Sequence, residues 1–182
     1  MTARYFSAAL LALALSAAAN ADQVEDIFAP LPGFVTIGEP ASAEDAAAIR
    51  ALFGTLGRGW GTGDAAMVAS VYADDAEWMN AFGEIVRGAD NIEAYLRGMW
   101  ADEPDDIAAA EQTDEQGLSL RYVGDDAAIY HGVTRSTRAG ALPGADHRRV
   151  HSTFVVRKID GEWKVVHHHI SDARVGVAAV AP

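Results

Sequence analysis

Hydrophobic positions along the chain follow a helical spacing first and a strand spacing afterwards. From Ser42 to Trp60 the apolar residues recur every three or four positions, which predicts an amphipathic helix with Ser42 as its N-cap. The second half of this segment contains Gly54, Gly57 and Gly59. Because glycine costs up to about 1 kcal/mol relative to alanine inside a helix, we expect the helix to be irregular near its end.

Two more helices and one strand are expected before residue 103. Asp64 is suited to cap a short second helix, and a strand over 77–82 should be followed by a turn at Gly83-Glu84. A third helix is predicted by apolar spacing further on. The buried positions of the two helices would be Met67, Val68, Val71 and Tyr72, and then Ile92, Tyr95, Leu96, Met99 and Trp100.

The remaining chain alternates apolar and polar residues, which indicates strands near 107–112, 117–123, 127–138, 147–159 and 162–171. Helices followed by a run of antiparallel strands predict an α+β fold, with the N-terminal helices packed on one face of a strongly curved antiparallel sheet. Residues 22–41 are rich in proline and glycine without periodicity, so we expect an extended leader there. The domain should occupy 42–175, with a tail at 176–182.

The first 21 residues have the features of a cleaved secretory signal peptide. Arg4 precedes an apolar run from about Tyr5 to Leu15, and Ala19-Asn20-Ala21 supplies the small residues of a cleavage site. The run is too short for a good membrane anchor. We therefore predict a periplasmic or secreted protein, and since the chain has no cysteine its stability should come from the core without disulfides.

The composition limits the classes of partner. The chain is 50% hydrophobic, which suffices for a packed core, and its formal net charge is −12. A strongly acidic protein repels phosphate backbones and anionic lipid surfaces. We therefore predict that it binds neither nucleic acid nor membranes.

A hairpin near the end of the chain determines which side chains share a face. Asp160-Gly161 lies between two alternating runs and predicts a two-residue turn, which fixes the register. Counting outward from the turn puts Trp163, His167 and His169 on one face with Phe154. That face should look toward the helices, because it holds the two large aromatic residues and only one charge, Lys158 at the hairpin tip. The other face would carry His151 and His168, with Arg149 nearby as a dimer or solvent contact.

The inward pair His167 and His169 admits three interpretations. Roughly 6.6 Å apart along the strand, the two could bind one metal ion, with His131, Glu77 or Asp75 as a further ligand. Either could instead act as a general base. The third possibility is that they are hydrogen-bonded to neighbours such as Ser152 and only make a pocket amphipathic. Two histidines are an incomplete metal site, so we predict no metal and no cofactor.

Other residues are candidate companions of that pair. Asn80 is a candidate orienting or oxyanion donor, and either Tyr130 or His131 could supply a second donor, since neighbouring residues of a strand cannot both face inward. Aromatic residues could form a cage for a ligand or belong to the core. The predicted pocket consists of Trp60, Tyr72, Trp78, Phe82, Trp100, His131, Ser152 and Phe154.

Several of these motifs resemble those of a known family. Gly63-Asp64, Arg87-Gly88, the Asp160-Gly161-x-Trp163 hairpin and the Val166-His167-x-His169-x-Ser171 ending resemble the SnoaL-like, SgcJ/EcaC-type branch of the nuclear transport factor 2-like superfamily. This branch is related to the association domain of calcium/calmodulin-dependent kinase II. The resemblance covers about residues 42–173. It implies a cystatin-like cone roll with an internal pocket, and a homodimer formed through the outer face of the sheet.

The superfamily includes isomerases, cyclases, hydrolases and non-catalytic assembly domains, so the fold alone does not determine the activity. We expect a protein that binds a small, partly apolar organic molecule in the pocket. As an enzyme it would be a cofactor-independent isomerase, cyclase or hydrolase with His167 or His169 as base and Asn80 as helper. The alternative is a non-catalytic binding or dimerisation module.

Overall fold

The computed structural model describes residues 33–102, 116–136 and 148–172. Its elements in chain order are β1 (Val35–Ile37), α2 (Ala43–Thr62), α3 (Ala65–Ala69), β2 (Tyr72–Met79), β3 (Ile85–Arg87), α4 (Ala89–Asp102), β4 (Gln116–Tyr122), β5 (Ala127–Ser136), β6 (Arg148–Ile159) and β7 (Glu162–Asp172). The predicted α+β class is confirmed. The predicted signal peptide, the strand at 107–112 and the tail lie outside the described residues.

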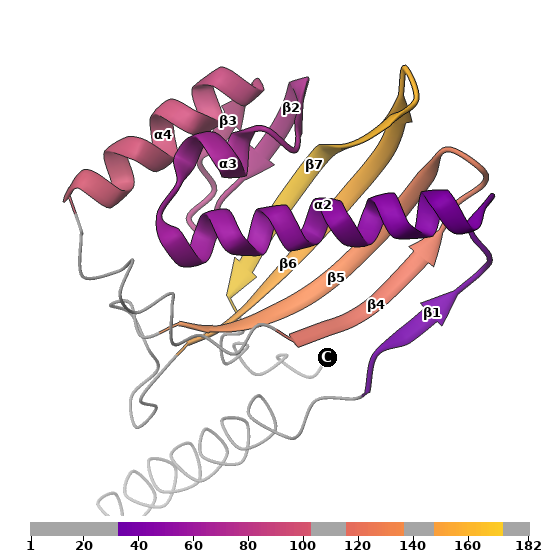
Figure 1. Ribbon diagram of the computed structural model, residues 1–182. Helices are drawn as coiled ribbons and strands as arrows, with labels where there is room; N and C mark the ends of the chain where they lie inside the picture. The colour runs from indigo at the N-terminus through magenta and orange to yellow at the C-terminus, as the bar shows by residue number, and fades with distance from the viewer. Residues whose placement is uncertain (1–32, 103–115, 137–147, 173–182) are drawn as a thin grey trace, which may run out of the picture. The chain divides into compact units, whose positions relative to one another are not determined.

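The strands form one seven-stranded sheet in the order β1-β4-β5-β6-β7-β2-β3. The pairs β1–β4 and β2–β7 are parallel, and the other pairs are antiparallel. Figure 1 shows α2 lying across one face of the curved sheet, with α3 and α4 near β2 and β3. We call the face toward the helices the inner face and the opposite one the outer face.

Helix α2 is continuous through its glycines, so the expected irregular end is wrong. Ser42 is the N-cap as predicted, and its hydroxyl accepts from the Asp45 backbone N–H at 3.1 Å. Gly59 is required for packing, because a Cβ there would lie 2.7 Å from Val68 Cγ2 of α3. Close contact between the two helices therefore outweighs the conformational cost of glycine. The helix ends at Gly63, whose φ of 66° is left-handed.

Two strand boundaries differ from the prediction. Strand β2 begins at Tyr72 rather than at residue 77, because the chain leaves α3 and joins the sheet at once. The backbone carbonyl of Val71 accepts from the Val165 N–H at 2.8 Å, so sheet pairing prevails over the helical spacing of these residues. Strand β1 lies within the expected leader and pairs in parallel with β4. Because β1 has only three residues, with little alternation of apolar and polar positions, the sequence pattern does not predict it.

The core lies between the helices and the inner face. It contains Ile49, Leu52 and Leu56 of α2, Ile92 and Leu96 of α4, and Val156, Trp163 and Val165 of the β6–β7 hairpin. The register predicted near the turn is confirmed, with Lys158 opposite Trp163 and Val156 opposite Val165. No helix within the described ranges is both long and apolar enough to cross a membrane.

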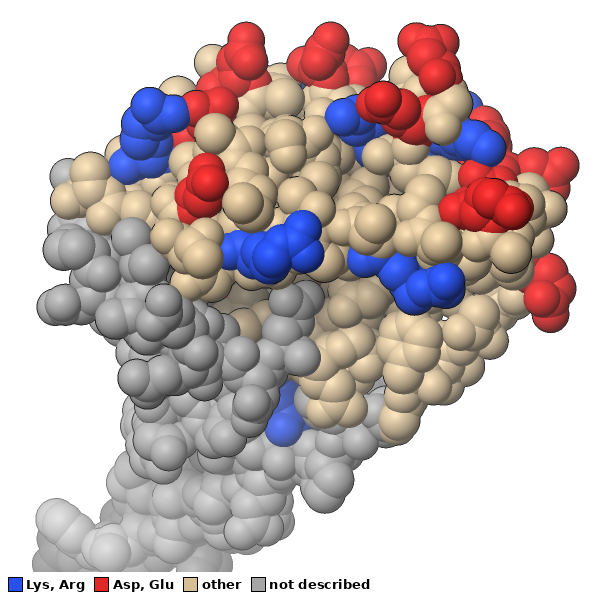
Figure 2. All heavy atoms as spheres, viewed as in Figure 1, with Lys and Arg blue, Asp and Glu red and all other residues tan. Residues whose placement is uncertain are grey.

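Acidic side chains gather along the rim over β2, α4 and the β6–β7 turn (Figure 2). Asp74, Asp75, Asp160 and Glu162 are exposed there. The negative charge is thus carried by the surface, while the layer beneath the helices is mostly apolar.

Candidate functional site

An extra residue in β7 reverses the expected orientation of its histidines. Val156 pairs with Val165 but Val155 pairs with His167, so Val166 is a β-bulge. The pairing of β7 with β2 shifts at the same place, from Tyr72–Val165 to Glu77–His167. Because side chains alternate, one extra residue moves every later side chain to the other face. The prediction that His167 and His169 point inward and His168 outward is therefore wrong.

The two histidines expected in the pocket lie on the outer face. The side chain of His167 is 38% exposed, and its Nδ1 lies 3.7 Å from Glu77 Oε1. Glu77 in turn forms a 2.8 Å ion pair with Arg87. His169 is exposed. Neither histidine reaches the layer beneath the helices, so the inward-pair argument for a base or a metal site at these positions does not apply.

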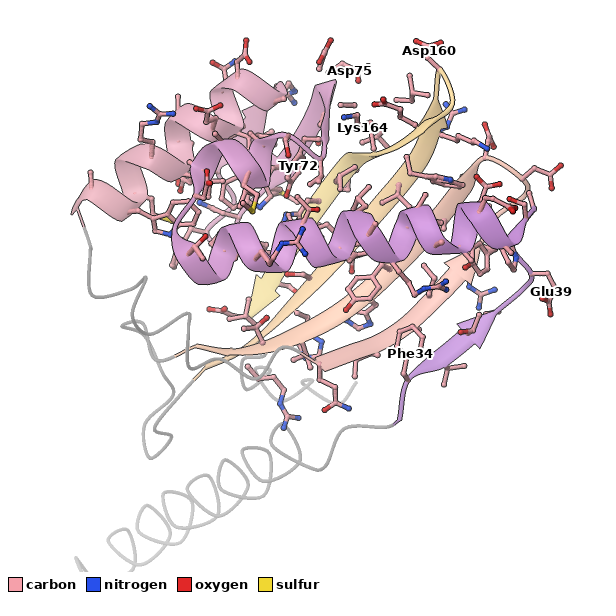
Figure 3. The ribbon with its side chains drawn as sticks, in the orientation of Figure 1. Phe34, Glu39, Tyr72, Asp75, Asp160 and Lys164 are labelled. Carbon is pink, nitrogen blue, oxygen red and sulfur yellow. The ribbon has the colours of Figure 1, made fainter. Side chains whose placement is uncertain are left out.

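His168 is the histidine that enters the interior, where its exposed fraction is only 1%. Its ring stacks on Phe154 with centroids 3.8 Å apart, and lies nearly parallel to Trp78 with centroids 5.9 Å apart. Its Nδ1 is 2.8 Å from the hydroxyl of Tyr72, which also lies between helices and sheet (Figure 3). We call Tyr72, Trp78 and His168 the histidine cluster.

Burial keeps both partners of this hydrogen bond uncharged. It lowers the pKa of His168 well below its usual value, and the neighbouring His167 and His169 lower it further. Burial also raises the pKa of Tyr72. A protonated phenol facing a neutral imidazole donates to the Nδ1 lone pair, and the imidazole hydrogen is then on Nε2. The cluster thus presents a neutral N–H donor at His168 Nε2.

Two nitrogens of the histidine cluster are buried without a hydrogen-bond partner among the described residues: His168 Nε2 and Trp78 Nε1. Buried polar groups are nearly always paired, and an unpaired one costs about 1–3 kcal/mol. The two nitrogens of an imidazole point in nearly opposite directions, so Nε2 is directed away from Tyr72. The aromatic interior therefore holds two donors without a partner among the described residues.

Beyond His168, on the side away from Val165 and the β6–β7 turn, the inner face carries small residues. Gly132 pairs with Gly117 on β4 and with Ser152 on β6, and Ser152 pairs with Ile170 on β7. The ring of Tyr130 leans over both glycines: a Cβ on Gly132 would lie 2.9 Å from Tyr130 Cε1, and one on Gly117 2.9 Å from its hydroxyl. The glycines therefore make room for this tyrosine.

The predicted pocket residues divide into two groups. Trp60, Tyr72, Trp78, Trp100 and Phe154 lie in a continuous aromatic layer, in which Trp60 contacts Trp78 and Trp100 edge to face. Ser152 is half-buried on the inner face. Placing Phe82 and His131 in the pocket is wrong, since Phe82 is 68% exposed in the β2–β3 turn and His131 points to the outer face. Of the alternatives Tyr130 and His131, Tyr130 faces inward.

Asn80 stabilises the β2–β3 turn. Its Oδ1 accepts from the backbone N–H groups of Phe82 and Glu84, at 2.9 and 3.0 Å. Its Nδ2 donates to Glu84 Oε2 at 2.7 Å and to the Tyr95 hydroxyl at 2.9 Å. Both amide hydrogens and both acceptor positions are used, so the amide has no capacity left for a substrate oxygen.

A second buried polar group lies at the opposite end of the inner face, beside the β6–β7 turn. Asp45 Oδ1 accepts from Trp163 Nε1 at 2.8 Å and lies 2.7 Å from Lys158 Nζ, while its Oδ2 accepts from Ser42 at 2.9 Å. We call these four residues the hairpin cluster. The hydrogen bond from Lys158 contributes most to lowering the pKa of Asp45 to about 2, followed by those from Trp163 and Ser42.

The candidate metal ligands are not assembled. Asp75 is exposed on the rim, Glu77 is paired with Arg87, and His131 lies beside His151 on the outer face. Within the described ranges, no three histidine, aspartate or glutamate side chains are grouped to hold a metal ion.

Sequence reasoning missed the role of His168, although it included Tyr72, Trp78 and Phe154 among the pocket residues. The bulge at Val166 places His168 on the inner face. The sequence around Val165 and Val166 gives no local signal of a bulge. A glycine often marks a bulge, and none is present here.

Comparisons with known proteins agree with this architecture. The model of the calcium/calmodulin dependent protein kinase II association domain family matches residues 45–174. No curated protein is similar enough to match the chain.

Solved structures with the same fold include three from bacteria. A domain with a cystatin-like fold from Nostoc punctiforme is 20% identical, with a TM-score of 0.60, covering 73% of this chain and 80% of that one. A putative calcium/calmodulin dependent protein kinase II association domain from Xanthomonas campestris is 22% identical, with a TM-score of 0.51, covering 79% and 98%. A ketosteroid isomerase-like protein from Erwinia carotovora is 17% identical, with a TM-score of 0.55, covering 78% and 100%.

Proposed function

Because this chain belongs to the calcium/calmodulin dependent protein kinase II association domain family, whose nuclear transport factor 2-like fold suits ligand binding, we propose that it binds a small, partly apolar organic molecule beside His168. The observation that carries the proposal is a pair of buried nitrogens, His168 Nε2 and Trp78 Nε1, that have no hydrogen-bond partner in the described part of the chain. A ligand atom that accepts a hydrogen bond would remove the cost of leaving them unpaired.

The surroundings of His168 define the chemistry of this ligand. Phe154, Trp78 and Tyr130 offer aromatic surface, which favours a flat or cyclic apolar body. Lys158 is the cation described on the inner face of the sheet, and it is already paired with Asp45. Burying a charge on the ligand without an opposite charge beside it would be costly. We therefore propose an uncharged ligand with a carbonyl oxygen that accepts from His168 Nε2.

The site would polarise that carbonyl. A neutral imidazole donor held by Tyr72 stabilises negative charge that develops on the oxygen, as in reactions that pass through an enolate. The low pKa of His168 disfavours this residue as a base, because a base must hold a proton during the reaction. In an isomerase, cyclase or hydrolase, His168 would be the hydrogen-bond donor and another group the base.

Matched ligands test this proposal. We expect acetophenone and related cyclic ketones to raise the melting temperature of the wild-type chain, and ethylbenzene, which has the same shape without the carbonyl, to raise it less. His168→Leu should remove the difference between ketone and hydrocarbon. His169→Leu on the outer face is the control and should retain it. A ketone response that is absent, or that is equal in wild type and His168→Leu, would contradict the proposal.

A second candidate function is assembly through the outer face of the sheet. Ile129 and Val155 pair at the centre of that face and are half-buried in the single chain, which supports a homodimer formed there. Sedimentation equilibrium tests this: Val155→Glu should convert a dimer to a monomer, whereas Val155→Thr should not. A chain that is monomeric without any substitution would exclude it.

We also propose that the protein is exported and that residues 1–21 are removed. The basic residue, the apolar run and the Ala19-Asn20-Ala21 site support this. Mass spectrometry of the chain secreted from bacteria should find Asp22 as the first residue. A chain that keeps Met1 in the cytoplasm would contradict it.

A further inference from the structure

Two histidines from neighbouring strands meet on the outer face of the sheet. His131 of β5 pairs in the ladder with Thr153, and His151 lies two residues before Thr153 on β6, so the two histidines are diagonal neighbours. His131 Nε2 lies 3.1 Å from His151 Nδ1, and the ring centroids are 5.2 Å apart. Neither the proposed interior site nor the fold makes use of this pair.

The separation of the two nitrogens suits a shared metal ion. Two ligand nitrogens at 2.0–2.1 Å from one tetrahedral ion stand roughly 3.3 Å apart, and slightly less in an octahedral site. The observed 3.1 Å therefore needs a modest rotation of the rings and no movement of the backbone. The two strands are paired over their whole described length around this point, which holds the Cα positions of both histidines.

From this geometry we propose that His131 and His151 form a two-histidine site for a divalent transition-metal ion such as Cu²⁺, Ni²⁺ or Zn²⁺ on the outer face of the sheet. Imidazole is a preferred ligand of these ions, whereas Mg²⁺ and Ca²⁺ prefer oxygen. No third histidine or carboxylate of the described residues joins the pair, so water completes the coordination sphere in the single chain. The ion would be exchangeable.

Burial lowers the pKa of His151, and the neighbouring His131 and Arg149 lower it further. One hydrogen lies between the two nitrogens, and on metal binding it moves to the other nitrogen of its own ring. Neighbouring groups on this face include Ser119 on β4, Thr153 on β6, and His169 and Ser171 on β7, with Arg149 as the cation that opposes binding.

The test uses the full chain without an affinity tag, titrated with CuCl₂, NiCl₂ and ZnCl₂ in a calorimeter at pH 7.5. We expect one ion to bind per chain. His131→Gln and His151→Gln should each weaken binding about tenfold or more, since changes even outside the ligand shell typically cost 10–100-fold. The electron paramagnetic resonance spectrum of bound Cu²⁺ should show nitrogen coupling that decreases in either variant.

Matched controls use the other histidines. His167→Gln and His169→Gln, made separately, should each leave the affinity unchanged, and circular dichroism should show that every variant is folded. Binding below pH 6 should weaken, because protons compete for the same nitrogens. The inference is overturned if no ion binds, or if the affinity is lost in either control and kept in the His131 and His151 variants.

Discussion

The inner face of the sheet carries two buried polar clusters, and they differ in how completely they are hydrogen-bonded. In the hairpin cluster, the carboxylate of Asp45 accepts from Lys158, Trp163 and Ser42. In the histidine cluster, one hydrogen bond joins Tyr72 to His168, and two ring nitrogens have no partner among the described residues. The first arrangement is complete and fastens the start of α2 to the β6–β7 turn. The second is incomplete, as expected of a group that meets a ligand.

The largest effect should come from breaking the complete cluster. Trp163→Ala removes a buried indole and one donor to Asp45, so we expect the free energy of unfolding to fall by about 3–5 kcal/mol. Urea unfolding followed by circular dichroism measures this. Trp163→Phe keeps most of the apolar surface and should cost less. If Trp163→Ala leaves the midpoint unchanged, the cluster is not a structural fastening.

A smaller effect is expected when the histidine cluster loses its one hydrogen bond. Tyr72→Phe leaves His168 Nδ1 buried without a donor, which should cost about 1–3 kcal/mol. Adding His168→Leu removes the unpaired nitrogens of the imidazole as well, so the double variant should be more stable than Tyr72→Phe alone. Urea unfolding of the wild type, the two single variants and the double variant gives the coupling energy between Tyr72 and His168. Additive losses would show that the two side chains do not interact.

Much of the fold could be predicted because local patterns agree with the tertiary structure. The Ser42 cap, the helical spacing of α2 and α4, and the Asp160-Gly161 turn each depend on residues close in sequence. Strand β1 and the early start of β2 were not predictable in this way. Their pairing partners, β4 and β7, lie far along the chain, and the pairing depends on the completed sheet.

The candidate site was predictable only in part, for a related reason. Alternation assigned Trp163 and Val165 to the core correctly, since they lie between the turn and the bulge. Beyond Val166 the same rule gave the wrong face for all three histidines. Tyr72 and Phe154 were expected in the pocket as aromatic residues, and their contacts with His168 became visible only with the true register.

Acidification should distinguish the clusters at low pH. The pKa of Asp45, about 2, is below the value of about 3.9 for an unfolded aspartate, so its carboxylate stabilises the fold above pH 4. This contribution should be lost as the pH falls from about 4 toward 2. Asp45→Asn should therefore show a shallower loss of melting temperature than wild type in that window. Equal slopes would mean that the carboxylate does not bind Lys158 and Trp163 as described.

The smallest expected effect concerns the histidine cluster between pH 7 and 5. An unfolded histidine takes up a proton near pH 6.5, whereas burial keeps His168 neutral to much lower pH. The unfolded chain then binds more protons, so acidification destabilises the fold, by at most about 1.4 kcal/mol per pH unit for one histidine. The low pKa of His151 acts in the same direction, so His168→Leu should reduce the slope and His168→Leu with His151→Gln should reduce it further. If His168→Leu has the slope of wild type, His168 is protonated in the folded chain, and the neutral donor on which the ligand proposal rests does not exist.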